Sequence, residues 1–131
     1  MKKVLRYEYA VAMSVNSMYF GGLKFQRTRV LTPEARNLRS KIIYDTKQQI
    51  LGDVFDRGDK LRVEIYFFDN WHNLDGGIKR RDIDNRLKFL IDSVFLGYEI
   101  DDSQIFELVA YKRQVANDEH PATVVIMEKI D

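Results

Sequence analysis

The chain has 131 residues, of which 45% are hydrophobic and 31% are charged, as in an ordinary globular domain. This length predicts one domain covering residues 1–131. The sequence contains no cysteine, which excludes a disulfide framework and thiolate metal sites. It also shows neither an apolar run of about 18 residues nor a basic, apolar leader, so we expect a cytoplasmic protein without membrane contact.

The formal net charge is only +1, but the charges are unevenly distributed. Residues 1–41 carry 9 Lys and Arg against 2 Asp and Glu, whereas residues 89–131 carry 3 against 9. A basic first third can supply a phosphate-binding surface even when the sum is near zero. Taken alone, the asymmetry fits a solvated surface at least as well.

The first half of the chain predicts one strand and one helix. Apolar and polar residues alternate over residues 4–13, which indicates a strand. Residues 14–31 contain glycines and a basic stretch and are expected to form a loop. Thr32-Pro33-Glu34 is typical of a helix start, and the helix should run to about Leu51, where Gly52 ends it.

The second half predicts a strand, a helix and two further strands. Alternation of apolar and polar residues predicts a strand over residues 61–67. Residues 69–81 are polar and contain glycines, which predicts a loop. A strong helical period runs from about Ile83 to Leu96, with Gly97 just past its end. Residues 105–111 and 123–130 are the last strands. The order β-α-β-α-β-β predicts an α+β (mixed α/β) fold, a single sheet of about four strands with two helices packed on it.

Charged residues are densest at the start of the second predicted helix, over residues 79–88. Asp82 in extended backbone and Asp84 in the first helical turn can converge, and Lys88 follows Asp84 by one turn on the same face. Asp101 and Asp102 come shortly after the helix. Converging carboxylates repel one another unless a hard cation such as Mg²⁺ or Mn²⁺ lies between them.

Basic residues around this acidic cluster suit a phosphodiester substrate, because they can hold its non-bridging oxygens while a metal polarises the phosphorus. These flanking residues are Arg80, Arg81, Arg86 and Lys88. A purely structural interpretation also stands. An Asp at a helix N-terminus is favourable by itself, Asp84–Lys88–Asp92 has the spacing of a surface ion ladder, and Asp101-Asp102 suits a turn.

The compound pattern resembles a known family. Arg80-Arg81-Asp82-Ile83-Asp84-Asn85-Arg86-Leu87-Lys88, an amphipathic helix, and then Asp101-Asp102-Ser103-Gln104 are similar to the signature of the RusA-like Holliday junction resolvases, small Mg²⁺-dependent endonucleases of bacteria and prophages. Ser14-Val15-Asn16 with Tyr19, followed by Arg27-Thr28-Arg29, resembles the opening segment of that family. The family often has prolines before this segment, whereas this chain has Ala12-Met13.

The resemblance implies roles for individual residues. It places the metal-site aspartates at Asp82, Asp84 and Asp102, with Asp101 as a weaker candidate, and the essential lysine at Lys88. Lys88 would orient or deprotonate the attacking water, or neutralise transition-state charge. The residues expected to hold DNA are Asn16, Lys24, Arg27, Arg29, Lys79, Arg80, Arg81 and Arg86. The resemblance also implies a homodimer that binds a four-way junction and no organic cofactor.

The sequence therefore favours a bacterial or prophage-encoded, Mg²⁺-dependent endodeoxyribonuclease, with Mn²⁺ as an alternative metal. It would resolve four-way DNA junctions by paired symmetric nicks in recombination and repair. Two alternatives remain open from the residues. One is a non-catalytic DNA-binding module whose acids are caps and ion pairs, and the other is a nuclease of the same chemistry that prefers flaps or replication forks.

Overall fold

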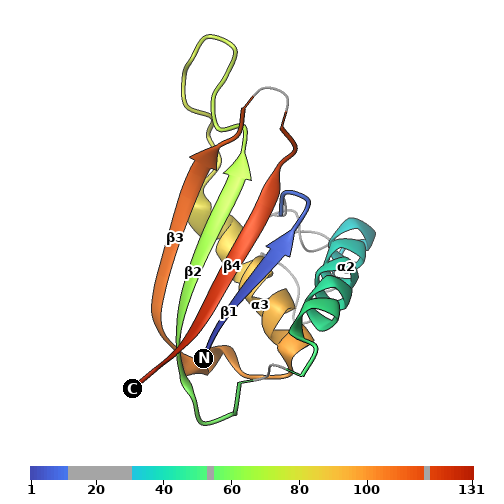
Figure 1. Ribbon diagram of the computed structural model, residues 1–131. Coiled ribbons are helices and arrows are strands. Elements are labelled where there is room, and N and C mark those ends of the chain that lie inside the picture. The colour runs from blue at the N-terminus through green and yellow to red at the C-terminus, as the bar shows by residue number, and fades with distance from the viewer. Residues whose placement is uncertain (12–30, 53–54, 117–118) are drawn as a thin grey trace, which may run out of the picture.

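Four strands form one mixed sheet in the computed structural model, which describes residues 1–11, 31–52, 55–116 and 119–131. The sheet order is β1-β4-β2-β3, in which β4 is antiparallel to both neighbours and β3 is parallel to β2 (Figure 1). The strands are β1 (Lys2–Tyr7), β2 (Lys60–Asp69), β3 (Ile105–Gln114) and β4 (Ala122–Ile130). The predicted α+β fold and element order are confirmed.

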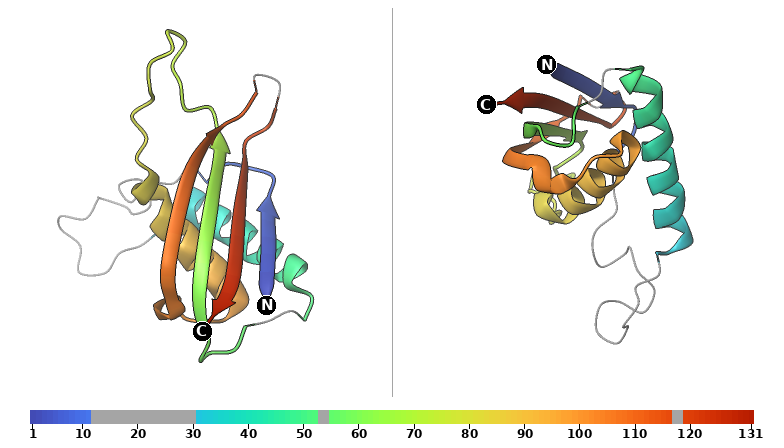
Figure 2. Two further views of the ribbon diagram at one scale, coloured as in Figure 1. Left: turned by 60° about the vertical axis from the view of Figure 1, so that its left-hand side comes forward. Right: turned by 90° about the horizontal axis from the view of Figure 1, so that it is seen from below.

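Two helices, α2 (Pro33–Ile50) and α3 (Ile83–Tyr98), lie on the same side of the sheet (Figure 2). Helix α3 connects the parallel strands β2 and β3, since parallel neighbours need a crossover connection. Helix α2 packs against α3 and β1. A short 3₁₀ helix, η1 (Asp102–Gln104), leads from α3 into β3.

Two sequence predictions about element ends are wrong. The strand predicted over residues 4–13 ends at Tyr7, because the pairing of β1 with β4 stops at Tyr7 and Thr123, near the start of β4. Gly97 is also not the residue after α3. It lies inside the helix, and the left-handed C-cap is Glu99, with φ of 62°.

The core lies between the sheet and the helices. Inward-facing residues of the strands alternate with exposed or half-buried ones, as the period of two requires. The largest fully buried side chains are Tyr7, Phe67, Phe89, Leu5, Ile42, Leu61, Ile65, Leu90, Met127, Val11 and Val63.

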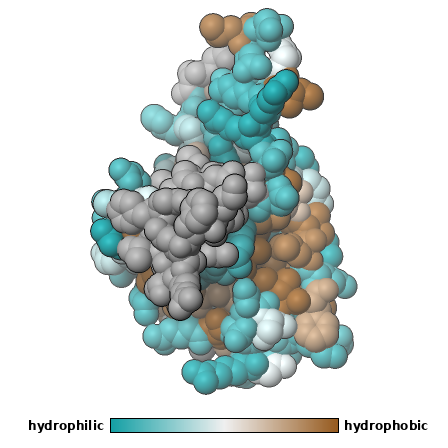
Figure 3. Space-filling view, turned by 180° about the vertical axis from the view of Figure 1, so that it is seen from behind, coloured by the Kyte–Doolittle hydropathy of each residue, from teal (hydrophilic) through white to brown (hydrophobic). Residues whose placement is uncertain are grey.

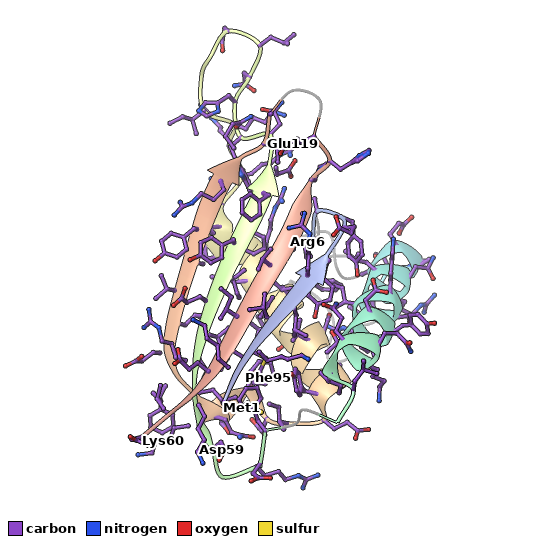
Figure 4. All side chains as sticks on the ribbon, viewed as in Figure 1. Met1, Arg6, Asp59, Lys60, Phe95 and Glu119 are labelled. Carbon is purple, nitrogen blue, oxygen red and sulfur yellow. The ribbon has the colours of Figure 1, made fainter. Side chains whose placement is uncertain are left out.

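The side-chain amide of Gln49 on α2 pairs with part of the free edge of β1. It accepts a hydrogen bond from the N–H of Arg6 (labelled in Figure 4) at 2.8 Å and donates one to the Arg6 carbonyl at 2.9 Å.

A buried ion pair joins the end of β2 to the first turns of α3. Asp69 and Arg86 are 8% and 5% exposed, and Arg86 Nη1 lies 3.2 Å from Asp69 Oδ2. The guanidinium also lies 4.8 Å from the centre of the Trp71 ring. Arg81 is the second cation near Asp69, at 3.7 Å. The N-terminal part of α3 is therefore held at a fixed position relative to the sheet.

The other end of α3 is set by its close approach to α2. A Cβ atom added at Gly97 would lie 2.8 Å from Thr46 Cβ and 3.3 Å from the carbonyl oxygen of Ile43. Thr46 is fully buried, and its hydroxyl bonds Tyr7 Oη at 2.6 Å and the Ile42 carbonyl at 2.7 Å. Thr46 therefore has little freedom to move away.

We expect Gly97→Ala to lower the free energy of unfolding by about 1–3 kcal/mol, because the overpacking at Thr46 outweighs the better helix propensity of alanine. Urea denaturation measures the change. Gly58→Ala is the matched control, since a Cβ there meets nothing within 4 Å. Equal stability of the two variants would show that the helices separate at little cost.

Arg86→Ala should lower the free energy of unfolding by about 3 kcal/mol, because it leaves the Asp69 carboxylate buried without its nearest cation. Arg80→Ala is the control, because this arginine is exposed and its loss should change stability by less than about 0.5 kcal/mol. Thermal and urea unfolding measure both. A small effect of Arg86→Ala would contradict the structural role of the ion pair.

Candidate active site and nucleic-acid interface

Asp82 and Asp84 lie at the N-terminus of α3, after the segment that connects β2 to this helix. Asp82 is the N-cap residue, with extended backbone at φ −74° and ψ 136°, and Asp84 follows in the first turn. This confirms the predicted change from extended to helical backbone between them. The Asp82 side chain makes no capping hydrogen bond to the helix. Both residues are exposed, and the partial positive charge of the helix N-terminus favours carboxylates there.

Lys88 lies one turn beyond Asp84 on the solvent side of α3. Its side chain is 63% exposed, and its Nζ lies 3.9 Å from Asp92 Oδ2. Part of the predicted ion ladder is thus present, but a pair this long and exposed adds only a few tenths of a kcal/mol to stability. The ammonium group is therefore accessible to a ligand that binds at the N-terminal end of α3.

Asp101 and Asp102 lie at the opposite end of α3, at the start of η1. Asp101 caps η1, since its carboxylate accepts a hydrogen bond from the Ser103 N–H at 2.8 Å, and the Gln104 side chain accepts one from the Asp101 N–H. The hydrogen bonds from Ser103 hold the pKa of Asp101 below its usual value. Asp101 thus has a structural task, and both Asp101 and Asp102 are exposed.

Gln104 of the same motif is a buried anchor. Its side-chain amide donates to the carbonyl oxygens of Asp56 and Asp59, at 2.8 and 3.1 Å. It therefore ties η1 to the segment that enters β2. The hydrogen bonds of Asp101 and Gln104 therefore fix the position of the backbone at Asp102, which lies between them.

The acidic residues do not form one cluster within a single chain. Helix α3 has 16 residues and is about 24 Å long; Asp82 and Asp84 lie at its start, whereas Asp102 follows its end. Within the described part of the chain, no three Asp, Glu or His side chains come together in a way that could hold a metal. Within one chain the structure therefore does not bring Asp82 and Asp84 together with Asp102.

Asp92 is an acid whose place the sequence did not reveal. With Asp101 and Asp102 it lines a shallow surface pocket, together with Arg39, Phe95, Leu96 and Ile100. In the sequence it is only one member of a possible ion ladder. Its position ten residues after Asp82 could have indicated this, because ten helical residues span about 15 Å and place Asp92 nearer to the segment that follows the helix.

The predicted DNA-binding residues fall into three groups. Arg80 and Arg81 are exposed and Lys79 is half-buried, so all three can reach a phosphate. Arg86 is buried against Asp69 and Trp71, and we therefore correct its assignment from DNA contact to structural support. Asn16, Lys24, Arg27 and Arg29 lie outside the described residues.

Residues 69–81, predicted as a loop, contain an ordered hairpin turn. His72 and Ile78 form an antiparallel bridge, and Gly76 has φ of 87° in the turn between them. The pair Asp75-Gly76 was the sequence signal, since glycine is favoured at this left-handed position. The hairpin projects beyond the same end of the sheet at which α3 begins (Figure 1).

Comparison with known proteins supplies the family. A model of the family "Endodeoxyribonuclease RusA" matches residues 5–128, which include both acidic segments, both helices, strands β2 and β3, most of β4 and half of β1. No match was found among curated proteins. Among the described residues, no helix is long and apolar enough to cross a membrane. The chain belongs to the RusA endodeoxyribonuclease family.

Proposed function

We propose that this protein is a Mg²⁺-dependent endonuclease that resolves four-way DNA junctions by paired symmetric nicks, and that it acts as a homodimer. The observation that carries the proposal is the family match over residues 5–128, with Asp82, Asp84 and Lys88 exposed in the first turns of α3. A nuclease that acts on a nearly two-fold symmetric junction needs two equivalent reaction centres, which a two-fold dimer provides.

The donor chemistry at the N-terminus of α3 fits Mg²⁺. This cation prefers oxygen ligands and commonly takes only one or two protein carboxylates, with waters and substrate phosphate completing its shell. Asp82 and Asp84, two residues apart and both exposed, would hold it. Once bound there, Mg²⁺ would supply Lewis acidity toward the scissile phosphate.

The basic side chains near these aspartates have the tasks of binding and charge neutralisation. Arg80 and Arg81 precede Asp82 directly and are exposed, so they can hold the DNA backbone on either side of the scissile bond. Lys88, one turn beyond Asp84, can orient the attacking water or neutralise charge that develops on the phosphate. Arg86 serves the same centre indirectly by fixing the start of α3.

The separation of the two acidic segments favours a reaction centre built from two protomers. A two-fold axis perpendicular to α3 would set the two copies of this helix antiparallel. Asp82 and Asp84 of one protomer would then lie beside Asp102 of the partner subunit, and two such centres would form in one dimer. The three carboxylates could thus converge although one chain holds them apart.

Exposed apolar side chains mark the surface that would meet the second copy. Leu96 on α3 is 53% exposed, and Phe106 and Leu108 on the neighbouring strand β3 are 62% and 44% exposed. Apolar side chains also gather on the helix-bearing side of the molecule (Figure 3). Strand β3 is an edge strand of ten residues, and such an edge is usually covered or paired.

The first test is cleavage of a synthetic four-way junction in Mg²⁺ and in EDTA, with linear duplex, flap and fork substrates for comparison. We expect paired incisions in Mg²⁺ only. Asp82→Asn should reduce them by about 100-fold or more, since even the loss of a group that supports a metal ligand costs about 10–100-fold. Asp131→Asn, at an exposed aspartate far along the chain, is the control and should cut normally.

Other outcomes of this test would replace the proposal. Binding of the junction without incision, equal in the wild type and Asp82→Asn, would indicate a DNA-binding module. Faster cleavage of flaps or forks than of junctions would indicate a different substrate for the same chemistry.

The second test is subunit complementation between Asp82→Asn and Asp102→Asn. Each variant alone should be inactive. In a mixed dimer with shared centres, one centre carries both substitutions and the other carries neither, so about a quarter of the wild-type nicking should return after random subunit exchange. The returned activity should nick one strand per binding event. If each protomer holds its own complete centre, the mixture stays as inactive as the separate variants.

A further inference from the structure

A short hairpin extends from the end of the sheet beside Asp82 and Asp84. We call residues 70–79 the projecting hairpin, which stands clear of the sheet and helices in both Figure 1 and Figure 2. Its arms are joined by bonds from the Asn73 N–H to the Gly77 carbonyl at 2.7 Å and from the Lys79 N–H to the Trp71 carbonyl at 2.9 Å. It is therefore a defined structural element.

The base of the projecting hairpin is anchored firmly. Trp71 is 4% exposed, and its indole N–H donates to the carbonyl oxygens of Phe67 and Arg113 at 3.1 and 3.0 Å. The guanidinium of Arg86 and the ammonium of Lys112 each lie 4.8 Å from the Trp71 ring centre. A preorganised element loses little conformational entropy when it binds a partner.

The tip of the projecting hairpin carries a fully exposed leucine side chain. Leu74 has a relative exposure of 111%, and Ile78 on the returning arm has 75%. Within the described residues neither side chain belongs to the hydrophobic core or packs against it. A single exposed leucine is ordinary on a protein surface, but here it stands at the end of an anchored element that leads directly into Arg80–Asp84.

Basic side chains gather at the base of the projecting hairpin, and a single carboxylate lies at its tip. Lys79, Arg80 and Arg81 lie at its base, where they would contact phosphates. The tip carries Leu74 beside Asp75, whose carboxylate accepts the Gly77 N–H at 2.8 Å. A carboxylate at the tip disfavours contact with phosphates there, so the tip suits the apolar faces of bases.

We propose that Leu74 at the tip of the projecting hairpin packs against the exposed base pair at the branch point of a DNA junction, and so contributes to the preference for junctions over linear duplex. Apolar side chains inserted at base steps are a known mode of DNA binding, and their cost is the unstacking of bases. At a branch point stacking is already interrupted, so this cost is smaller there than in duplex. The inference rests on the proposed function.

The test compares junction and duplex binding by fluorescence anisotropy without a divalent metal, so that cleavage plays no part. Leu74→Ser should lower the ratio of junction to duplex affinity by about tenfold or more, since burial of a leucine side chain corresponds to one or two factors of ten in affinity. Leu74→Met should keep most of the ratio. Leu51→Ser is the matched control, because Leu51 is 83% exposed at the end of α2, away from the projecting hairpin.

A local probe reports the contact itself. With 2-aminopurine at the branch point, the wild type and Leu51→Ser should change the fluorescence in the same way, and Leu74→Ser should lose most of that change. A probe placed in a junction arm should not distinguish the proteins.

Three results would overturn the inference, and they are separable. An unchanged affinity ratio and fluorescence signal in Leu74→Ser would reject the role of Leu74 alone, with the proposed function intact. A lower mass of Leu74→Ser in sedimentation would show that the tip contacts a second copy of the chain. A wild-type protein with no preference for junctions would reject the proposed function together with this inference.

Discussion

Helix α3 sets the distance between the two acidic segments, and the organisation of the proposed reaction centre follows from that distance. The helix is fixed at its first turns by the buried Arg86–Asp69 pair and near its last turn by the contact of Gly97 with Thr46. The first contact joins α3 to the sheet, and the second joins it to α2. Because neither end can shift independently, Asp82 and Asp102 cannot approach each other within one protomer.

This rigidity has an electrostatic consequence. Carboxylates that converge without a cation repel one another, and the cost grows as they are removed from water. In the single chain Asp82, Asp84 and Asp102 are exposed, and the acids at the two ends of α3 are far apart, so folding incurs little of this cost. In the proposed dimer the repulsion arises only on assembly, where metal and phosphate-binding arginines are available to offset it. Assembly and formation of the reaction centre are then one event.

Much of the fold could be predicted because local patterns determine it. The cap at Thr32-Pro33 and the apolar stripe of α3 led to helix positions within about two residues of those observed. The motif around Asp82 and Asp84 was visible for the same reason, since extended backbone followed by a helix is a local property. The separation of Asp102 from them within one chain could not be predicted, because it depends on the length of α3 and on the path of the chain after it. Arg86 was misassigned because only the packed structure turns it toward Asp69.

The projecting hairpin illustrates how the same framework can serve substrate selection as well as reaction. Trp71 packs under the guanidinium of Arg86, and Arg86 also fixes the start of α3 through Asp69. One buried arginine thus couples the hairpin to the helix that carries Asp82 and Asp84. Because both elements share this support, a DNA branch point held at Leu74 would have a defined position relative to the carboxylates. Recognition of the branch and placement of the scissile phosphate then become parts of a single geometric requirement, which linear duplex cannot satisfy in the same way.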